Sequence, residues 1–200
     1  MIYVAFLGSP VEQDVAWDAA DQTGSWTLTN SSRTAQVTSW PGIASVLGDV
    51  GRSAGKRYFE VEYVTGASFG TAVRHDIGIT RSRPVASGAS GEGTGGGYRR
   101  GGAIFISGSS VGSVSALSAG DVVGVAIDLG SGDVWFSLNG AWTQGDPGTG
   151  DIPEGSVLVP NTYYPFASAE SPAAMTVTLR AKTSEFDYPA PTGFSSWALS

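Results

Sequence analysis

Cysteine is absent from this chain of 200 residues, and histidine occurs only once. The absence of cysteine excludes thiolate catalysis and thiolate metal ligands. Any catalytic triad or histidine-based metal site would have to be built around His75 alone. Charged residues make up only 14% of the sequence, whereas the outer faces of soluble helices usually carry many of them. Glycine, with 29 residues, and proline, with 10, instead indicate many turns.

Positive charge is also scarce, since the formal net charge is -7. Such a chain lacks the basic field that a polyphosphate requires, so we expect no nucleic-acid partner. Residues 1–7 are apolar but few, and no basic residue flanks them, so they predict a first strand and neither a signal peptide nor a membrane anchor. A compact chain of this length buries about 70% of its unfolded surface. We therefore expect no disulfide, metal or cofactor to be needed for folding.

Alternation with a period of two dominates wherever apolar residues gather. In residues 58–65, Phe59 and Val61 point to one side, while Glu60 and Glu62 point to the other. This pattern predicts a strand with one solvated polar face. The same period recurs in residues 121–128, 134–138 and 175–180.

Turn residues separate these runs. Asn139 and Gly140 form the strongest hairpin signal, because a type I′ turn requires positive φ at both central positions. With a reversal at residues 128–133, they predict a three-stranded meander over residues 121–143. Weaker strand candidates are residues 25–29, 36–39, 76–80, 102–106, 111–115 and 165–168. No segment has the pattern of a three-turn amphipathic helix, so the sequence predicts an all-β fold, an antiparallel β-sandwich. The Gly- and Ser-rich residues 86–102 are expected to form a long surface loop of this single core.

Several of these segments resemble SPRY (B30.2-like) domains in the order that the family shows. Residues 55–62 resemble the opening strand of the family, in which a glycine precedes basic residues, two aromatics and alternating acids. Residues 120–128 and 134–140 are similar to its most recognisable hairpin. Further matches are residues 17–18, 27–30, 77–79, 164–166 and 186–194. The resemblance covers residues 17–200 as one domain and leaves residues 1–16 as an N-terminal strand or extension.

This resemblance implies a concanavalin-like jelly-roll sandwich that is not an enzyme and binds through loops at one edge. The Gly- and Ser-rich, acidic and cysteine-free character is similar to SPRY domains of bacteria and phages. It implies a structural protein on the phage particle surface, a head or tail decoration, fibre or adaptor, or otherwise a soluble bacterial protein. Expected partners are other virion proteins or a host surface receptor, protein or glycan, and a homo-oligomer stays open. The loop over residues 81–101 is longer than the family pattern, so family contacts do not transfer residue by residue.

Arginines gather in one stretch of this acidic chain. Arg81, Arg83, Arg99 and Arg100, with Tyr98 beside the last pair, are candidates to bind a carboxylate, an acidic glycan or an acidic protein, because the guanidinium is a planar donor. The alternative is a set of solvated loop charges that pair with Asp76 and Glu92. Trp142, just beyond the Asn139–Gly140 turn, is the tryptophan best placed for an exposed contact, and it leaves a carbohydrate-binding module open.

Two acidic clusters remain to be weighed. Glu60 and Glu62 have the spacing of a glycosidase acid pair, but the third acid expected in sandwich glucanases is replaced by Thr65. The favoured interpretation is a polar strand face, and a sandwich glycosidase is a remote alternative. Asp146 and Asp151, together with Glu154, lie in a Gly-rich loop whose oxygen ligands suit calcium. Their spacing fits no EF-hand or repeat calcium motif, so a plain acidic turn is favoured and the calcium question stays open.

Overall fold

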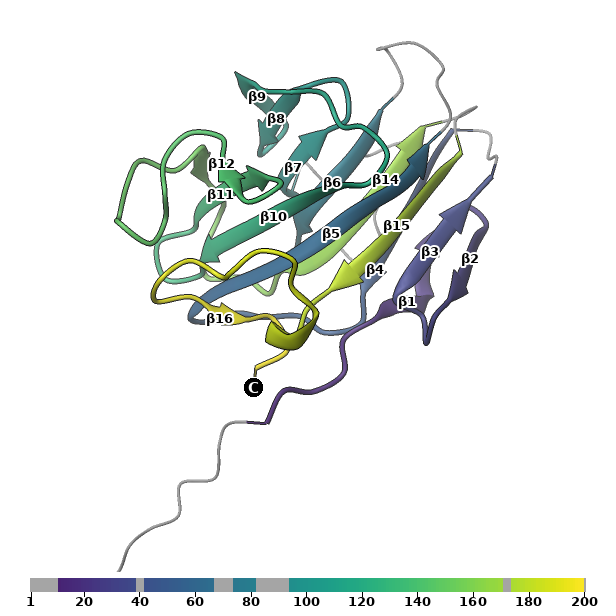
Figure 1. Ribbon diagram of the computed structural model, residues 1–200, viewed down its shortest axis with the longest axis horizontal. Coiled ribbons are helices and arrows are strands. Elements are labelled where there is room, and N and C mark those ends of the chain that lie inside the picture. The colour runs from purple at the N-terminus through teal and green to yellow at the C-terminus, as the bar shows by residue number, and fades with distance from the viewer. Residues whose placement is uncertain (1–10, 39–41, 67–73, 82–93, 171–173, 200) are drawn as a thin grey trace, which may run out of the picture.

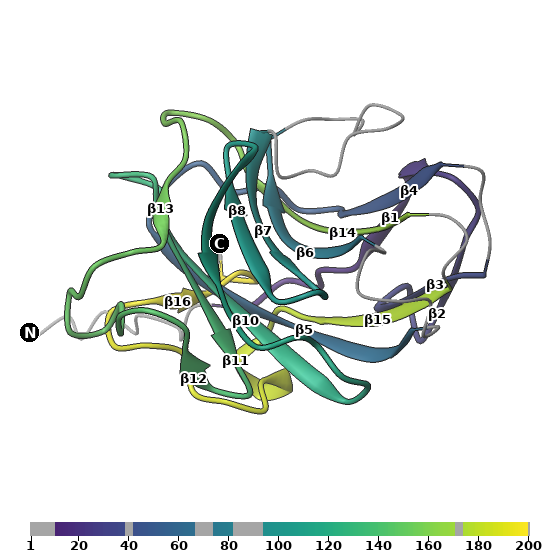
Figure 2. The ribbon, with the colours of Figure 1, turned by 90° about the horizontal axis from the view of Figure 1, so that it is seen from above.

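Two sheets contain nearly all of the regular secondary structure in the described chain. The computed structural model describes residues 11–38, 42–66, 74–81, 94–170 and 174–199. Figure 2 shows the sheets as two layers lying face to face, which confirms the predicted sandwich. In order, the first sheet contains β1 (Trp17–Thr23), β4 (Ile43–Gly48), β14 (Tyr164–Glu170), β6 (His75–Thr80), β7 (Gly95–Arg99), β8 (Ala103–Ile106) and β9 (Ser109–Ser113).

The second sheet carries the predicted meander and the C-terminal end of the chain. Its order is β12 (Ala141–Trp142), β11 (Asp133–Leu138), β10 (Asp121–Asp128), β5 (Lys56–Gly66), β15 (Met175–Arg180), β3 (Thr34–Val37) and β2 (Trp26–Thr29). The short β13 (Gly155–Ser156) pairs with β11, and β16 (Ser195–Ser196) pairs in parallel with β5. Between β15 and β16 the chain makes one 3-10 turn, Thr183–Glu185, and then crosses the outer face of this sheet near β5 (Figure 1).

The core lies between the two sheets and follows the alternation of the strands. Phe59 and Val61 on β5, Val125 on β10 and Phe136 on β11 are all 0% exposed and belong to one cluster with side chains of the first sheet. Burying such a side chain contributes about 2–3 kcal/mol. The inward facing predicted for these positions is therefore confirmed.

The sequence pattern did not predict two interior strands, β4 and β7. β4 is buried at all six positions, so it shows no alternation. β7 lies in the stretch expected to be a surface loop, but it pairs with β6 and β8 in the interior of the first sheet. Glycines on β6 and β7 allow these two strands to pack closely, because a Cβ on Gly78 of β6 would lie 2.0 Å from the carbonyl oxygen of Gly96 on β7. The loop prediction is thus wrong for residues 95–99, and residues 86–93 lie outside the described residues.

The turns follow the predicted chemistry. Asn139 and Gly140 have φ of 50° and 78°, as a type I′ turn requires. The Asn139 side chain also accepts a hydrogen bond from the Val122 N–H at 2.9 Å, which fixes the start of β10. The strand predicted at residues 1–7 lies outside the described residues. In the part that is described, no helix has the length and apolar character needed to cross a membrane.

Candidate functional site

Trp142 stands between two hollows at the edge of the second sheet. The Asn139–Gly140 turn reverses the chain, so that Trp142 on β12 pairs with Ser137 on β11. The indole packs edge-on against the ring of Tyr58, with 6.2 Å between ring centroids. It is partly buried, and it lines both a hollow of about 450 Å³ and one of about 270 Å³. Trp142, the predicted contact residue, thus lies on a ridge between two concave surfaces. We call this ridge the Trp142 ridge.

The larger hollow, here called the C-terminal hollow, lies on the outer face of the second sheet. Its floor includes Tyr58 and Ser137, both almost completely buried. One side is formed by the loop that contains Asp146 and Thr149, and the other by residues 188–192. The two sides approach each other closely, since a Cβ on Gly148 would lie 2.9 Å from the Thr192 nitrogen. The hollow is therefore half-enclosed by two segments that are distant in sequence.

Buried Glu60 holds the C-terminal side of this hollow in place. Its carboxylate is 0% exposed and accepts hydrogen bonds from the N–H groups of Asp187 at 2.8 Å and Tyr188 at 2.9 Å, and from the Tyr58 hydroxyl at 2.9 Å. Burial raises the pKa of Glu60, although these hydrogen bonds oppose the rise. Burial, followed by the nearby Glu60 charge, also raises the pKa of Tyr58. The sequence analysis expected a solvated polar face here, and this is wrong for Glu60 because the C-terminal segment covers it.

Glu62, the second acid on that face, is engaged by an arginine. Arg180 donates to Glu62 at 2.6 Å and also pairs with Asp187. The Arg180 guanidinium lies 4.0 Å from the Glu60 carboxylate as well. Since Glu60 is inaccessible and Glu62 is in an ion pair, the two carboxylates are not presented to a substrate as a glycosidase acid pair would be.

The smaller hollow, here called the edge hollow, lies between the two sheets at their edges. It is lined by Trp142 on β12 and Thr143 just after it, and by residues 113–115 at the end of β9 and just beyond it. Tyr98 also borders it, and the Tyr98 hydroxyl donates to the carbonyl of Ser115, another lining residue, at 2.6 Å. Burial raises the pKa of Tyr98 to about 12, so the phenol stays protonated and keeps this donor role.

The predicted arginine cluster is divided between several environments. Arg99 donates to Asp76 at 2.8 Å, and its guanidinium lies 3.8 Å from the ring centroid of Phe105. Arg81 is exposed at the other end of β6, because Asp76 pairs with Arg99 whereas Thr80 pairs with Gly95. The structure therefore does not bring Arg81 together with Arg99 into one patch.

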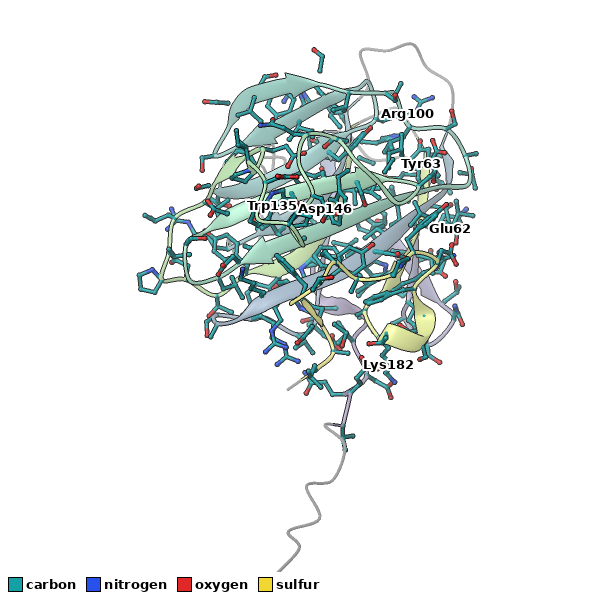
Figure 3. All side chains as sticks on the ribbon, turned by 60° about the vertical axis from the view of Figure 1, so that its left-hand side comes forward. Glu62, Tyr63, Arg100, Trp135, Asp146 and Lys182 are labelled. Carbon is teal, nitrogen blue, oxygen red and sulfur yellow. The ribbon has the colours of Figure 1, made fainter. Side chains whose placement is uncertain are left out.

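The remaining members of that predicted group lie elsewhere. Arg100 is partly buried and lies close to Tyr63 and His75. Figure 3 shows Arg100 and Tyr63. Tyr98 is 0% exposed and packs in the core, although it also borders the edge hollow. Arg83 lies outside the described residues. The alternative to a binding cluster is that these arginines pair with acids such as Asp76, and Arg99 does form an ion pair with Asp76.

His75 is also a core residue. It is 0% exposed, and its Nδ1 lies 2.7 Å from the Tyr63 hydroxyl. Burial, with a smaller contribution from the Arg100 charge, lowers the pKa of His75 to about 4. The imidazole is therefore neutral near pH 7 and lies away from solvent, where a substrate would have to be.

The Asp146 loop is closed by hydrogen bonds of its own. The Asp146 carboxylate accepts from the Gly148 N–H at 2.7 Å, and the Asp151 carboxylate accepts from the Thr149 hydroxyl at 2.8 Å. Glu154 points elsewhere, because it accepts from the Phe136 N–H and the Thr143 hydroxyl. Across the described ranges, no three His, Cys, Asp or Glu side chains are grouped so that they could hold a metal ion.

Sequence reasoning missed the C-terminal side of the hollow. Tyr188 packs against the hairpin turn, since a Cβ on Gly140 would lie 2.4 Å from its ring. Phe194 packs edge-on against Trp135 on the outer face of the sheet, with 5.9 Å between ring centroids. The signal was a run of two aromatics and two prolines in residues 186–191, too rich in rings for an ordinary exposed tail.

Comparison with known proteins supports the fold through structure and not through sequence. No protein-family model matches the chain, and no curated protein matches it. Among solved structures, the SPRY domain of human HERC1 matches with a TM-score of 0.61 and 16% identity, and the match covers 82% of this chain and 97% of that domain. The chain has the fold of a SPRY domain. This match confirms the SPRY-like sandwich that the sequence resemblance implied. The outer face of its second sheet carries the C-terminal hollow.

Proposed function

We propose that this protein is a non-catalytic SPRY-type binding module that holds a partner across the Trp142 ridge. The observation that carries the proposal is the position of Trp142, a partly buried indole that lines two adjacent hollows. Large aromatic side chains in concave, partly desolvated surfaces are where binding free energy concentrates. SPRY-type edge loops on a rigid sandwich are suited to this role, because the scaffold holds the contacts in place before the partner arrives.

We propose a non-catalytic role because the candidate acid, Glu60, and the candidate base, His75, are both buried. Glu60 serves the fold as an acceptor for two backbone N–H groups, and His75 is enclosed in the core. General acid–base chemistry requires such groups within hydrogen-bond reach of a substrate. Exposed Arg81 and partly buried Arg100 remain in the proposal as separate contacts to acidic groups of the partner, together with Arg83 and Arg99. Tyr98 is not among these contacts, because it is buried and its hydroxyl donates to Ser115.

We further propose that the module belongs to a phage particle, where it binds neighbouring virion proteins or a receptor on the host surface. Support comes from the sequence, which is acidic, rich in glycine and free of cysteine, and which resembles phage-type SPRY domains. A part exposed on a particle must stay folded without reduced thiols, and a single large core meets this need.

Three observations test these proposals. Mass spectrometry of particles purified from the source strain should detect the protein, and genes for capsid, portal or tail proteins should lie beside its gene. Labelled protein should bind to those particles or to host cells, and Trp142→Ala should lose this binding while Leu158→Ala, at an exposed position outside both hollows, retains it. Equal binding by the two variants would overturn the assignment of the Trp142 ridge, and absence from purified particles would overturn the virion role.

A further inference from the structure

The C-terminal hollow has features that point to one class of ligand. We infer that it binds an uncharged saccharide unit of a glycan, with the sugar ring against Trp142. This inference deepens the proposed binding role, because it names the chemistry recognised on one side of the Trp142 ridge. It rests on the volume, the aromatic walls, the charge and the rigid polar rim of the hollow.

Aromatic groups occupy the floor and both sides. Tyr58 lies below, Trp142 stands on one side, and Tyr188 with Pro189 and Pro191 forms the other. A pyranose presents a C–H face that packs on flat apolar rings, while its hydroxyls stay at the ring edge. The volume of about 450 Å³ lies within the range of roughly 300–1,000 Å³ typical of small-molecule sites. The hollow therefore has room for a sugar ring together with its hydroxyls.

Charge in the hollow selects against anions. Asp146 is the one charged side chain among the described residues that line it, and no arginine or lysine does so. A carboxylated or sulfated sugar would meet this negative charge without a cation to offset it. The arginine stretch that suggested acidic glycans lies on the first sheet, away from this hollow. A neutral sugar is thus the glycan type that the lining suits.

Polar groups at the rim are held in position before any ligand arrives. The Gly148 N–H donates to the Asp146 carboxylate, and the Thr149 hydroxyl lies within hydrogen-bond distance of the Asp146 carbonyl and the Asp151 carboxylate. Sugar hydroxyls both donate and accept, so they match a rim of carboxylate and hydroxyl groups. Fixed partners lower the entropic cost of binding.

A proline-rich peptide is the other ligand that aromatic grooves take. It suits this hollow less well, because the apolar side opposite Trp142 already consists of Pro189 and Pro191. A proline side chain also has no polar atom to offer the carboxylate of Asp146 and the hydroxyl of Thr149 at the rim, whereas a sugar hydroxyl can both donate to them and accept from them. The lining therefore favours the saccharide.

The test uses the whole chain and a panel of methyl glycosides of glucose, galactose, N-acetylglucosamine and rhamnose. Titration is followed in two-dimensional nitrogen–proton NMR spectra, which resolve the Trp142 indole and the amides of residues 143–146 and 148–151. We expect at least one glycoside to shift these signals saturably. Trp142→Ala and the exposed Thr149→Ala should each weaken binding about tenfold or more, whereas Phe105→Ala should not change it.

A charge comparison adds a second readout. The methyl glucuronide should bind more weakly than the methyl glucoside, and Asp146→Asn should reduce this difference. Absence of shifts with every glycoside, shifts confined to other surfaces, or saturable binding of a proline-rich peptide alone in this hollow would overturn the inference. If Trp142→Ala still abolishes binding to cells or particles in that case, the proposed binding role stands and only the saccharide is wrong.

Discussion

Glu60 on β5 accepts a hydrogen bond from the backbone N–H of Tyr188, 2.9 Å away and 128 residues later in the chain. With the Asp187 N–H and the Tyr58 hydroxyl, this contact ties the C-terminal segment to the outer face of the second sheet. The same segment forms one side of the C-terminal hollow. One buried carboxylate therefore supports both the stability of the sandwich and the shape of its candidate site.

Replacing Glu60 should separate these contributions. Glu60→Ala leaves two backbone donors and a tyrosine hydroxyl unpaired, and we expect it to lower the free energy of unfolding by about 2–4 kcal/mol. Glu60→Gln keeps an acceptor oxygen for the Tyr188 N–H and the Tyr58 hydroxyl, but its NH2 group then faces the Asp187 N–H, so its loss should be smaller, about 1–2 kcal/mol. Urea unfolding measures both, and hydrogen exchange should be faster at residues 187 and 188 in the alanine variant but only at residue 187 in the glutamine variant. Equal stability of the two variants would contradict this account.

Gly78 should not tolerate a side chain. A Cβ there would lie 2.0 Å from the Gly96 carbonyl oxygen, so Gly78→Ala must push β6 and β7 apart. We expect a loss of about 1–3 kcal/mol, the usual effect of overpacking. Gly112→Ala on β9 is the matched control, since no atom lies within 4 Å of the place that its methyl group would take. Thermal unfolding of the two variants compares them directly, and similar melting temperatures would argue against the tight β6–β7 contact.

Phe136 tests the inward facing of the hairpin strand. Its ring is 0% exposed and lies 6.4 Å from the ring centroid of Tyr98 on the opposite sheet. Phe136→Ala should destabilise the protein by about 3–5 kcal/mol, the cost of emptying a buried aromatic site. Leu158→Ala, at a 59% exposed position, should change stability by less than about 0.5 kcal/mol in the same chemical denaturation series.

His75 should make stability depend on pH. Its pKa falls from 6.5 to about 4 on folding, so between these values the unfolded chain binds the proton and the folded chain does not. The stability that neutral His75 contributes is complete above pH 6.5 and is lost as the pH falls. This loss reaches about 3 kcal/mol near pH 4. His75→Asn keeps an acceptor for the Tyr63 hydroxyl but does not titrate. The stability difference between wild type and variant, measured by urea unfolding across this range, should therefore shift in favour of the variant as the pH falls, and a constant difference would contradict the assignment.

Local pattern was enough to predict much of the fold and little of the site. The alternation in β5 and β10 and the Asn139–Gly140 turn are visible in short segments, and the structure confirms the inward-facing apolar positions and the turn. β4 and β7 were missed, since a strand buried on both faces or made of glycines shows no alternation. Trp142 was recognised because it follows a turn that the sequence identifies.

The sequence by itself determined an all-β sandwich with a hairpin at Asn139–Gly140, because period-two alternation and positive-φ turn residues act over a few residues. Only the tertiary structure decided that Glu60 is covered, that Tyr98 is buried and that Trp142 separates two hollows. Each of these depends on a segment far away in the chain that packs over a sheet face or edge. Alternation states which side chains share a face, but whether that face meets water depends on contacts that no local pattern contains.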